Sequence, residues 1–357
     1  MTVNRSQPRI LRARRGDGRL PPRRAQRGVA LLVAILLVAF GTIIAAAMAY
    51  NNAMTARRAA ATFEFDQALL VAEGAEALAA YGLQQTAKQN PTYTYPGQPW
   101  SQPLPPTEVT PGVMLEASLE DLQGRFNINN LVATDGETPN TVAIQAFQRL
   151  LAALDLDSKL SYYIVDWIDK DTTPMDPDGA EDSVYMEMDP PYRTPNLPIT
   201  STSELLAMPG VTRAEFDKLA PYIVALPLGV GINTCSASAP VLDALTGHVQ
   251  FSADPAQFAK DRADAGTCFP TPAEVEQAAG NVAGGNGATG IEGNSELGST
   301  GTGGTTQTLA SLLAQKSSWY RLTSFVTLGT AQFAVYTTLF QDSTGMVRPV
   351  MRSFTPD

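Results

Sequence analysis

The chain has 357 residues, of which 44% are hydrophobic, which is enough to form a folded core and excludes a wholly disordered protein. Its formal net charge is -10, but the first 28 residues hold nine Arg against one Asp, so the remaining 16 basic and 34 acidic residues give the rest a charge of -18. An acidic body of this kind repels nucleic acid and attracts cations or basic partners.

The first expected element is an apolar helix behind the basic segment. Residues 29 to 50 contain no charged side chain and read VALLVAILLVAFGTIIAAAMAY. A helix of about 20 such residues crosses a bilayer, and the positive-inside tendency keeps the Arg-rich segment in the cytoplasm. A cleaved secretory signal fits less well, because its apolar region runs only about 7 to 15 residues. An uncleaved signal anchor remains an alternative.

The helical pattern continues from Asn51 to Gln89, which is rich in Ala, Leu, Glu and Gln. Apolar residues there have the spacing of one buried stripe, namely Phe63, Phe65, Leu69, Leu70, Ala77, Leu78 and Tyr81. We therefore expect one helix from Val29 to the mid-80s, roughly 80 Å long at 1.5 Å per residue. Asn90 and the Pro-rich stretch from residue 91 to 111 end it.

Two strand-like regions lie far apart in the chain. The first half of residues 113 to 131 alternates as a strand does, and residues 319 to 354 predict two or three strands joined by Gly-containing turns. The long stretch between them is mainly helical in pattern. The predicted fold class is α+β, with a long N-terminal helix packed on a small antiparallel sheet and a large, mainly helical domain inserted between the strands.

Within the insert, amphipathic helices are expected at residues 139 to 154 and 158 to 168. Residues 203 to 226 predict a helix, a turn at Pro209-Gly210 and a second helix, and another helix begins at Pro240. Residues 281 to 306 are almost wholly Gly, Thr, Ser, Asn and Ala, a composition typical of a flexible loop.

Cys235 and Cys268 are the two cysteines of the chain. In an oxidising compartment a disulfide between them is the simplest use, and two buried free thiols are the alternative.

The strongest chemical feature is a run of carboxylates broken by Pro174, Pro177 and Gly179. Its members are Asp166, Asp169, Asp171, Asp176, Asp178, Glu181 and Asp182. Carboxylate oxygens presented from a turning loop are the ligands that Ca²⁺ prefers. Neither Asp169 nor Asp176 starts an EF-hand loop, because acids and Gly are missing at the required positions. A solvated acidic loop is the alternative.

No catalytic arrangement accompanies these acids. A carboxylate pair could serve glycoside hydrolysis, but such pairs are common and no cleft can be deduced from the sequence. His248 is the one histidine, it stands without a Ser or Cys nucleophile motif, and a surface position is expected for it. The Gly-rich segment lacks G-K-[ST] and is no P-loop. We expect neither an enzyme nor a small-molecule substrate.

The segment SELLAMPGVTRAEFDKLAPYI also resembles a helix-hairpin-helix DNA binder. Such binders surround the turn with Lys and Arg, whereas only Arg213 and Lys218 occur here, among Glu204, Glu215 and Asp217. Structural packing or a protein-binding face is favoured. A DNA-binding minor pilin of an uptake system stays as the alternative function.

The string QRGVALLVAILLVAFGTIIAAAMAY resembles the N terminus of type IV pilin-like proteins. The resemblance implies that a prepilin peptidase cuts between Gly28 and Val29 and that Val29 is then methylated. Most of these proteins carry Glu at mature position five, where it pairs with the terminal amine of a neighbouring subunit; here that position is Val33. An unpaired ammonium in an apolar filament core is costly, so a subunit without this Glu suits the filament tip.

Further motifs resemble the K subunit of type II secretion systems, a minor pseudopilin. In chain order they are ARRAAATFEFDQALLVAEGAEALA, DLQGRFNINNL, DWIDKDTTPMDPDGAEDSVY, PPYRTPNLPITSTSELLAMPGV, PYIVALP and INTCSASAPVLDAL. The long leader, the 281 to 306 segment and INTC depart from the family pattern. The departures leave the fold of the second half of the insert open.

The resemblance implies a subunit of the pseudopilus tip that binds the minor pseudopilins I, J and H, starts or caps assembly, and carries calcium in its inserted domain. It would be a single-pass inner-membrane protein with a periplasmic C-terminal part. The expected divisions are a leader (1–28), a transmembrane segment (29–50), a periplasmic helix (51–90), the first part of the pilin-like domain (91–135), the insert (136–310) and the last strands (311–357).

Overall fold

The computed structural model of the chain describes residues 27–283 and 307–355. Most of the predicted leader and most of the Gly-rich segment lie outside these residues. The chain divides into two units, Met1–Phe63 and Glu64–Asp357, and the helix α1 (Arg27–Gln89) contributes to both.

In the first unit, α1 presents apolar side chains to the surroundings along the stretch from residue 29 to 50. Leu32 and Leu36 are 65% and 69% exposed. Within the described residues, α1 is the one helix long and apolar enough to cross a membrane. Because these side chains have no protein to pack against, a bilayer is the environment that suits them.

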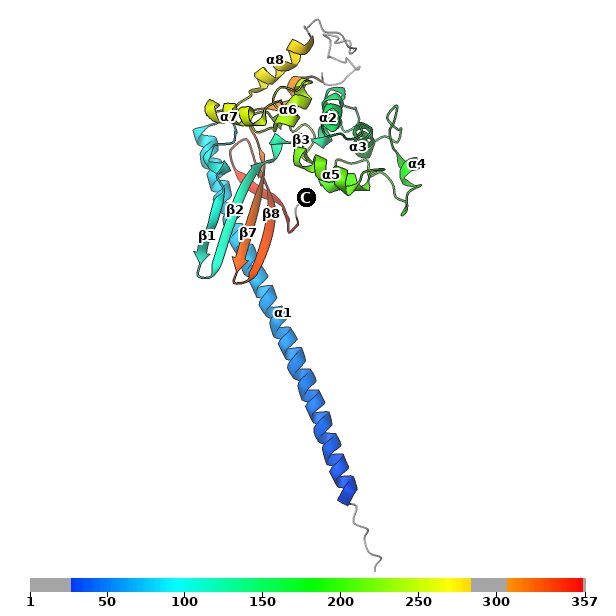
Figure 1. Cartoon of the computed structure of the whole chain (residues 1–357), viewed down its shortest axis with the longest axis vertical. Helices are drawn as coiled ribbons and strands as arrows, with labels where there is room; N and C mark the ends of the chain where they lie inside the picture. Colours follow the sequence, from blue (N-terminus) through cyan, green and yellow to red (C-terminus); the bar gives the residue numbers. More distant parts are fainter. Residues whose placement is uncertain (1–26, 284–306, 356–357) are drawn as a thin grey trace, which may run out of the picture. The chain divides into compact units, whose positions relative to one another are not determined.

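The second unit contains a five-stranded antiparallel sheet in the order β1-β2-β7-β8-β9 (Figure 1). Its strands are β1 (Leu104–Thr110), β2 (Val113–Asp121), β7 (Trp319–Leu328), β8 (Ala331–Gln341) and β9 (Val347–Ser353). β2 and β7 pair directly although the whole insert separates them in sequence. Burial alternates along β7 and β8, because one face of the sheet packs on α1.

Four alanines and one leucine mediate the contact between α1 and the sheet. They recur every three or four residues and comprise Ala68, Ala72, Ala75, Ala79 and Leu83. On the sheet they meet Leu115, Leu322, Val326, Val335 and Leu339. The predicted stripe was therefore wrong for most of its residues, since Phe63, Leu70, Ala77, Leu78 and Tyr81 are exposed. Alanines allow the helix to lie close to the sheet, and the larger side chains point away.

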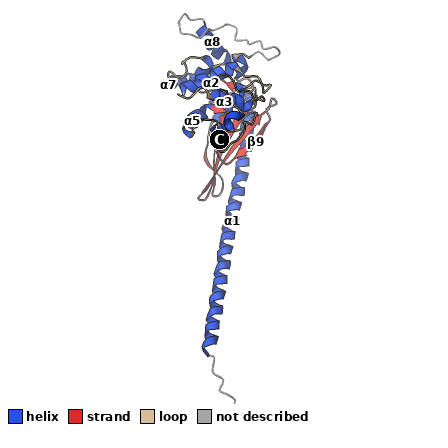
Figure 2. Cartoon of the chain, turned by 90° about the vertical axis from the view of Figure 1, so that its right-hand side faces the viewer, coloured by secondary structure: helices blue, strands red, loops and turns tan. Residues whose placement is uncertain are grey.

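The insert leaves the sheet after β2 and returns before β7, and its helices gather at one end of the sheet (Figure 1). Figure 2 shows the same separation of helical and strand regions in colour. The α-helices of the insert are α2 (Thr141–Ala153), α3 (Leu160–Ile168), α4 (Asp182–Tyr185), α5 (Arg213–Leu219), α6 (Ala239–Thr246), α7 (Pro255–Ala265), α8 (Pro272–Ala283) and α9 (Leu309–Leu312).

Shorter elements connect these helices. The 3-10 helices of the second unit are η1 (Pro99–Ser101), η2 (Leu122–Gly124), η3 (Ile128–Leu131), η4 (Thr202–Ala207) and η5 (Ala220–Tyr222). Two small parallel pairs join β3 (Phe126–Asn127) to β4 (Ile223–Val224) and β5 (Ile232–Asn233) to β6 (Leu313–Ala314). The insert has its own core, built around Phe147, Leu150 and Ile164.

The helices expected at 139 to 154, 158 to 168 and 240 onward are confirmed as α2, α3 and α6. Other expectations need correction. The Pro-rich stretch contains β1, because an edge strand tolerates Pro. The first helix of the 203 to 226 segment is the 3-10 helix η4, which Pro209 and Gly210 keep short, and the segment ends in β4. Residues 281 to 283 belong to α8, and α7 was not anticipated.

A buried polar group holds the insert to the sheet. The Asn233 side chain donates to the Thr94 carbonyl at 2.8 Å and to Asp121 Oδ2 at 2.9 Å, and the Ser317 hydroxyl donates to the same carboxylate at 2.7 Å. Burial raises the pKa of Asp121, although its hydrogen bonds act in the opposite direction. These contacts join both crossing points between the sheet and the insert.

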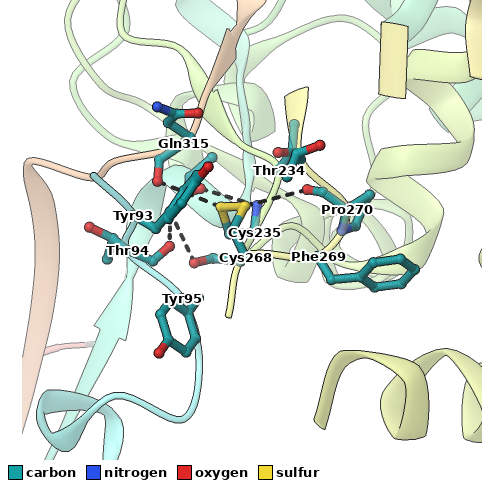
Figure 3. The surroundings of a disulfide bond; sticks show 12 residues. Tyr93, Thr94, Tyr95, Thr234, Cys235, Cys268, Phe269, Pro270 and Gln315 are labelled. Carbon is teal, nitrogen blue, oxygen red and sulfur yellow. Dashed lines mark hydrogen bonds between the residues drawn. A yellow bond between two sulfur atoms is a disulfide. The ribbon is translucent and has the colours of Figure 1, made fainter. Parts of the chain in front are cut away.

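Cys235 and Cys268 form a disulfide beside this polar group (Figure 3). Both side chains are buried, and the Cys235 sulfur lies 3.6 Å from the Gln315 carbonyl oxygen. The bond ties the segment after β5 to the segment between α7 and α8. It thereby fixes the second half of the insert near the returning chain.

Candidate metal centre

The acidic run begins in the last turn of α3 and continues through a turning loop. Asp166, in α3, is fully buried and accepts a hydrogen bond from the Met175 N–H at 3.0 Å. Gly179 lies where a Cβ would meet Asp166 Oδ2 at 2.3 Å and the Met175 nitrogen at 2.3 Å. Asp166 and Gly179 therefore fold the loop back on the end of α3.

This fold brings three of the seven predicted acids together. One oxygen from each of Asp169, Asp171 and Glu181 lies within 4.8 Å of the others. Asp169 is 3% exposed and Glu181 is 2% exposed, whereas Asp171 is exposed. Asp169 Oδ1 and Glu181 Oε1 are buried without a hydrogen-bond partner among the described residues.

The three buried carboxyls have raised pKa values. Burial, followed by the charges of Asp171, Asp166 and Glu181, raises the pKa of Asp169 to about 7. Burial likewise raises the pKa of Glu181 to about 7 and that of Asp166 to about 6. Gathering negative groups in a dry site is unfavourable unless a cation or a proton neutralises them.

The other four predicted acids lie outside this group of three. Asp166 anchors the loop, and Asp178 forms an ion pair with Lys159 at 3.0 Å. Asp182 Oδ2 lies 3.7 Å from Arg193 Nε, and Asp182 Oδ1 accepts a hydrogen bond from the Thr194 N–H at 3.1 Å. Asp176 is exposed. These side chains shape or surround the site.

A second segment, not anticipated as part of the site, packs against the acids. The Thr194 hydroxyl donates to Glu181 Oε2 at 3.1 Å, and Asn196 Nδ2 donates to the Asp171 carbonyl at 2.8 Å. The only sequence signal was the motif PPYRTPNLP, which carries no acid. A search restricted to carboxylates passes over such neutral residues.

The residues present fit a hard divalent cation. Asp169 and Glu181 each offer an oxygen that no N–H or O–H reaches among the described residues, and Asp171 adds a third, more exposed one. Oxygen-only donor sets are those of Ca²⁺ and Mg²⁺, and a flexible loop rich in carboxylates favours the larger ion. A bound cation would neutralise the group and hold the loop on α3.

The remaining predicted positions contribute no chemical group to this centre. Gly28, Val29 and Val33 lie in the first turns of α1. In the segment that resembles a helix-hairpin-helix, Arg213 Nε donates to Asp217 Oδ1 at 2.8 Å, so the charge of Arg213 is neutralised locally. His248, expected at the surface, is half-buried, with its ring nitrogens near the Thr246 carbonyl and the Gln250 side chain.

A cleft of about 630 Å³ lies between the outer face of the sheet and the segment from α5 to β4. None of the seven predicted acids lines it. The candidate metal centre is therefore separate from this cleft.

The fold defines a pilin-like class of protein, in which a long N-terminal helix packs on an antiparallel sheet, here with a helical insert. A family model described as type II secretion system, protein K, matches residues 124–228. The chain is 34% identical to the type II secretion system protein K of Pseudomonas aeruginosa over 244 residues, which cover 66% of this chain and 71% of that protein. The chain belongs to this protein K family.

Other relatives carry the same name. Protein K of Klebsiella pneumoniae is 36% identical over 58% of this chain and 66% of that protein. Protein K of Aeromonas hydrophila is 36% identical over 60% of this chain and 69% of that protein. The expected family membership is confirmed, and the chain is a component of a type II secretion system.

A solved structure shares the fold. It is described as the crystal structure of the GspK-GspI-GspJ complex from the type 2 secretion system of enterotoxigenic Escherichia coli. The matching chain superposes with a TM-score of 0.62 at 20% sequence identity, over 84% of this chain and 100% of that one. The α+β fold with a pilin-like helix and sheet is confirmed. Together with the apolar helix α1, the family supports single-pass membrane anchoring.

Proposed function

We propose that this chain is a minor pseudopilin of the pseudopilus tip, which binds the minor pseudopilins I, J and H and starts or caps pseudopilus assembly. The N terminus lies in the cytoplasm, α1 crosses the inner membrane, and the unit from Glu64 onward lies in the periplasm. This role requires no catalysis.

The observation that carries the proposal is the uncovered apolar side of α1 in the second unit. Leu70, Leu78 and Tyr81 are 68%, 56% and 61% exposed, and they lie on the opposite side of the helix from the alanines that contact the sheet. A stripe with this spacing fits a second helix that packs alongside. Helices anchored in the same membrane are the natural occupants.

Two further points support a position at the tip. Val33 leaves α1 without the Glu that would pair with the amine of an adjoining subunit, so this chain is suited to the end of the filament. The related solved chain is named as part of a complex with GspI and GspJ. We extend those partners to this chain by homology.

Co-purification tests the proposal. The full chain, extracted in detergent, should retain pseudopilins I and J of the same organism, and Leu78→Asp together with Tyr81→Asp should abolish retention. Val249→Asp is the matched control, because Val249 is 71% exposed but lies in the insert, after α6. Equal retention by all three proteins would reject the helix stripe, and no retention by the wild type would reject the tip role.

We also propose that Ca²⁺ is the ion held by Asp169, Asp171 and Glu181. Calorimetric titration of the chelator-treated full chain with CaCl₂ should show binding that Asp169→Ala or Glu181→Ala weakens. Asp176→Ala is the control, because Asp176 belongs to the same loop but lies outside the group of three. A wild type that gives no binding heat with CaCl₂ would overturn the proposal that this centre binds Ca²⁺.

A further inference from the structure

Arg57 and Arg58 lie in the first unit, on the part of α1 that follows the apolar stretch of residues 29 to 50. Both side chains are exposed, and neither guanidinium makes an ion pair or a hydrogen bond among the described residues. The sequence has no acid between Asp17 and Glu64, so no carboxylate lies three or four residues from either arginine, the spacing at which helical ion pairs form. This part of the helix therefore carries two positive charges that the chain itself does not neutralise.

The helix rise brings the two arginines to the headgroup level of a bilayer that α1 crosses. Residues 29 to 50 extend roughly 33 Å at 1.5 Å per residue, which fills a hydrocarbon core of about 30 Å. Tyr50, which is 67% exposed, lies at the end of this stretch, and tyrosine is enriched at the membrane boundary. The Cα atoms of Arg57 and Arg58 lie roughly 11 to 12 Å further along the helix. Because helical side chains lean toward the N terminus, the long arginine side chains reach back toward the lipid phosphates.

The angle between the two side chains favours lipid over a protein partner. Consecutive residues of an α-helix lie about 100° apart around its axis, so they do not share a face. A single neighbouring helix would therefore face only one of the two arginines, whereas headgroups surround a membrane-spanning helix on every side. A phosphate group also accepts two parallel hydrogen bonds from one guanidinium. An anionic headgroup is thus the chemistry that fits both side chains.

We propose that Arg57 and Arg58 bind the phosphates of anionic phospholipids on the periplasmic face of the membrane and thereby fix the depth of α1. This inference rests on the proposed membrane span of α1. Movement of the helix toward the cytoplasm would bury two charges in hydrocarbon, which is unfavourable. Movement toward the periplasm would break the phosphate contacts and expose apolar side chains to water. The pair therefore resists displacement of the anchor in both directions.

Short-range fluorescence quenching in vesicles tests the proposal. The full chain carries a fluorophore on Ala60→Cys, because position 60 is exposed and lies three residues after Arg57, and the two native cysteines are joined in the disulfide. The vesicles contain nitroxide-labelled phosphatidylglycerol or, for comparison, nitroxide-labelled phosphatidylcholine. Phosphatidylglycerol should associate preferentially, by roughly 5-fold if one arginine binds it and roughly 30-fold if both do. Because the quenching acts only over a short range, lipids attracted by the Arg-rich leader on the opposite membrane face do not contribute.

Arg57→Gln together with Arg58→Gln should abolish the preference, because glutamine retains helix propensity but carries no charge. Lys88→Gln together with Lys218→Gln is the matched control, since it removes the same charge from exposed positions of the second unit. No preference in the labelled parent chain, or a preference unchanged in the arginine variant, would overturn the lipid role. If that variant also failed to retain pseudopilins I and J, the arginines would contact a protein instead. Absence of quenching by either lipid in the parent chain would overturn the membrane span itself.

Discussion

Glu76 in α1 and Arg352 in β9 form a bidentate ion pair between the helix and the sheet. Arg352 Nε donates to Glu76 Oε1 at 2.7 Å, and Arg352 Nη2 donates to Glu76 Oε2 at 2.8 Å. The Thr337 hydroxyl donates to the same carboxylate at 2.8 Å, and Glu76 is only 6% exposed. The last strand is thereby fixed to the helix that begins the domain.

Glu76→Ala should therefore destabilise the fold by about 1 to 3 kcal/mol, because it leaves the buried Thr337 hydroxyl without its acceptor and removes the charge-assisted hydrogen bonds to Arg352. Glu73→Ala is the matched control: the Glu73 carboxylate lies 3.3 Å from Arg352, but its side chain is 42% exposed, so its loss should cost less than about 1 kcal/mol. Urea denaturation of the detergent-solubilised chain, followed by tryptophan fluorescence, measures both. Equal effects would show that burial of Glu76 contributes nothing.

The contact between α1 and the sheet shows how far the sequence could predict the fold. Periodicity predicted the long helix, the strands at either end of the insert and α2, α3 and α6, because these elements repeat one pattern over many residues. It did not reveal which side of α1 meets the sheet, because close packing there selects Ala over the larger apolar residues. That choice depends on a sheet whose strands β7 and β8 lie more than 200 residues later in the chain.

The metal centre was likewise only partly predictable from the sequence. The carboxylate run predicted the right loop, but only three of its seven acids converge. Which ones converge depends on the turn at Gly179 and on the burial of Asp166, and both are tertiary effects. Thr194, whose hydroxyl donates to Glu181, could not be found from charge, since it is neutral and lies 12 residues beyond Asp182.

Gly179→Ala should disrupt the loop. The added methyl would lie 2.3 Å from the Met175 nitrogen and 2.6 Å from the Met175 carbonyl oxygen, and backbone atoms cannot move aside as a flexible side chain can. We expect a loss of at least about 2 kcal/mol in the free energy of unfolding together with weaker Ca²⁺ binding. Gly280→Ala, in the exposed part of α8 where a Cβ meets nothing within 4 Å, should be neutral or slightly stabilising. Thermal unfolding measures the stability of the two variants, and calorimetry measures their Ca²⁺ affinity. Normal Ca²⁺ affinity in Gly179→Ala would contradict the loop geometry.

Removing the disulfide should destabilise the insert. Cys235 and Cys268 are 33 residues apart, and the loop-entropy relation gives about 3 to 4 kcal/mol for closing a loop of this length. The Cys235→Ser, Cys268→Ser double variant should lose about that amount in urea denaturation. The wild type in reductant should match the variant, and the oxidised wild type is the reference. A variant as stable as the oxidised wild type would show that the bond adds nothing to the fold.

Processing at Gly28 can be tested by intact mass. Protein extracted from membranes of the producing organism should lack residues 1–28 and carry one added methyl group, because the resemblance places the cut before Val29. Gly28→Leu should leave the leader attached, since the resemblance implies a peptidase that cuts after Gly. A wild-type mass equal to that of the full sequence would show that α1 acts as an uncleaved anchor.

The raised carboxyl pKa values predict an unusual pH dependence for the metal-free chain. Ordinary Asp and Glu titrate near pH 4, whereas burial raises the pKa of Asp166 to about 6 and those of Asp169 and Glu181 to about 7. The folded state therefore binds these protons more tightly than the unfolded state does. Their stabilising contribution is complete below about pH 4 and is lost as the pH rises to about 7.

In chelator, the midpoint of thermal unfolding should consequently fall by a few degrees between pH 5 and pH 8. Glu181→Gln should reduce the slope, because it replaces a titrating buried group with a neutral one, whereas Asp176→Asn should leave the slope unchanged, because Asp176 is exposed. Saturating CaCl₂ should remove the fall, since the cation binds the deprotonated carboxylates and its stabilising effect grows as they lose their protons. A metal-free midpoint with the same slope in the wild type and Glu181→Gln would show that Glu181 is already ionised at pH 5.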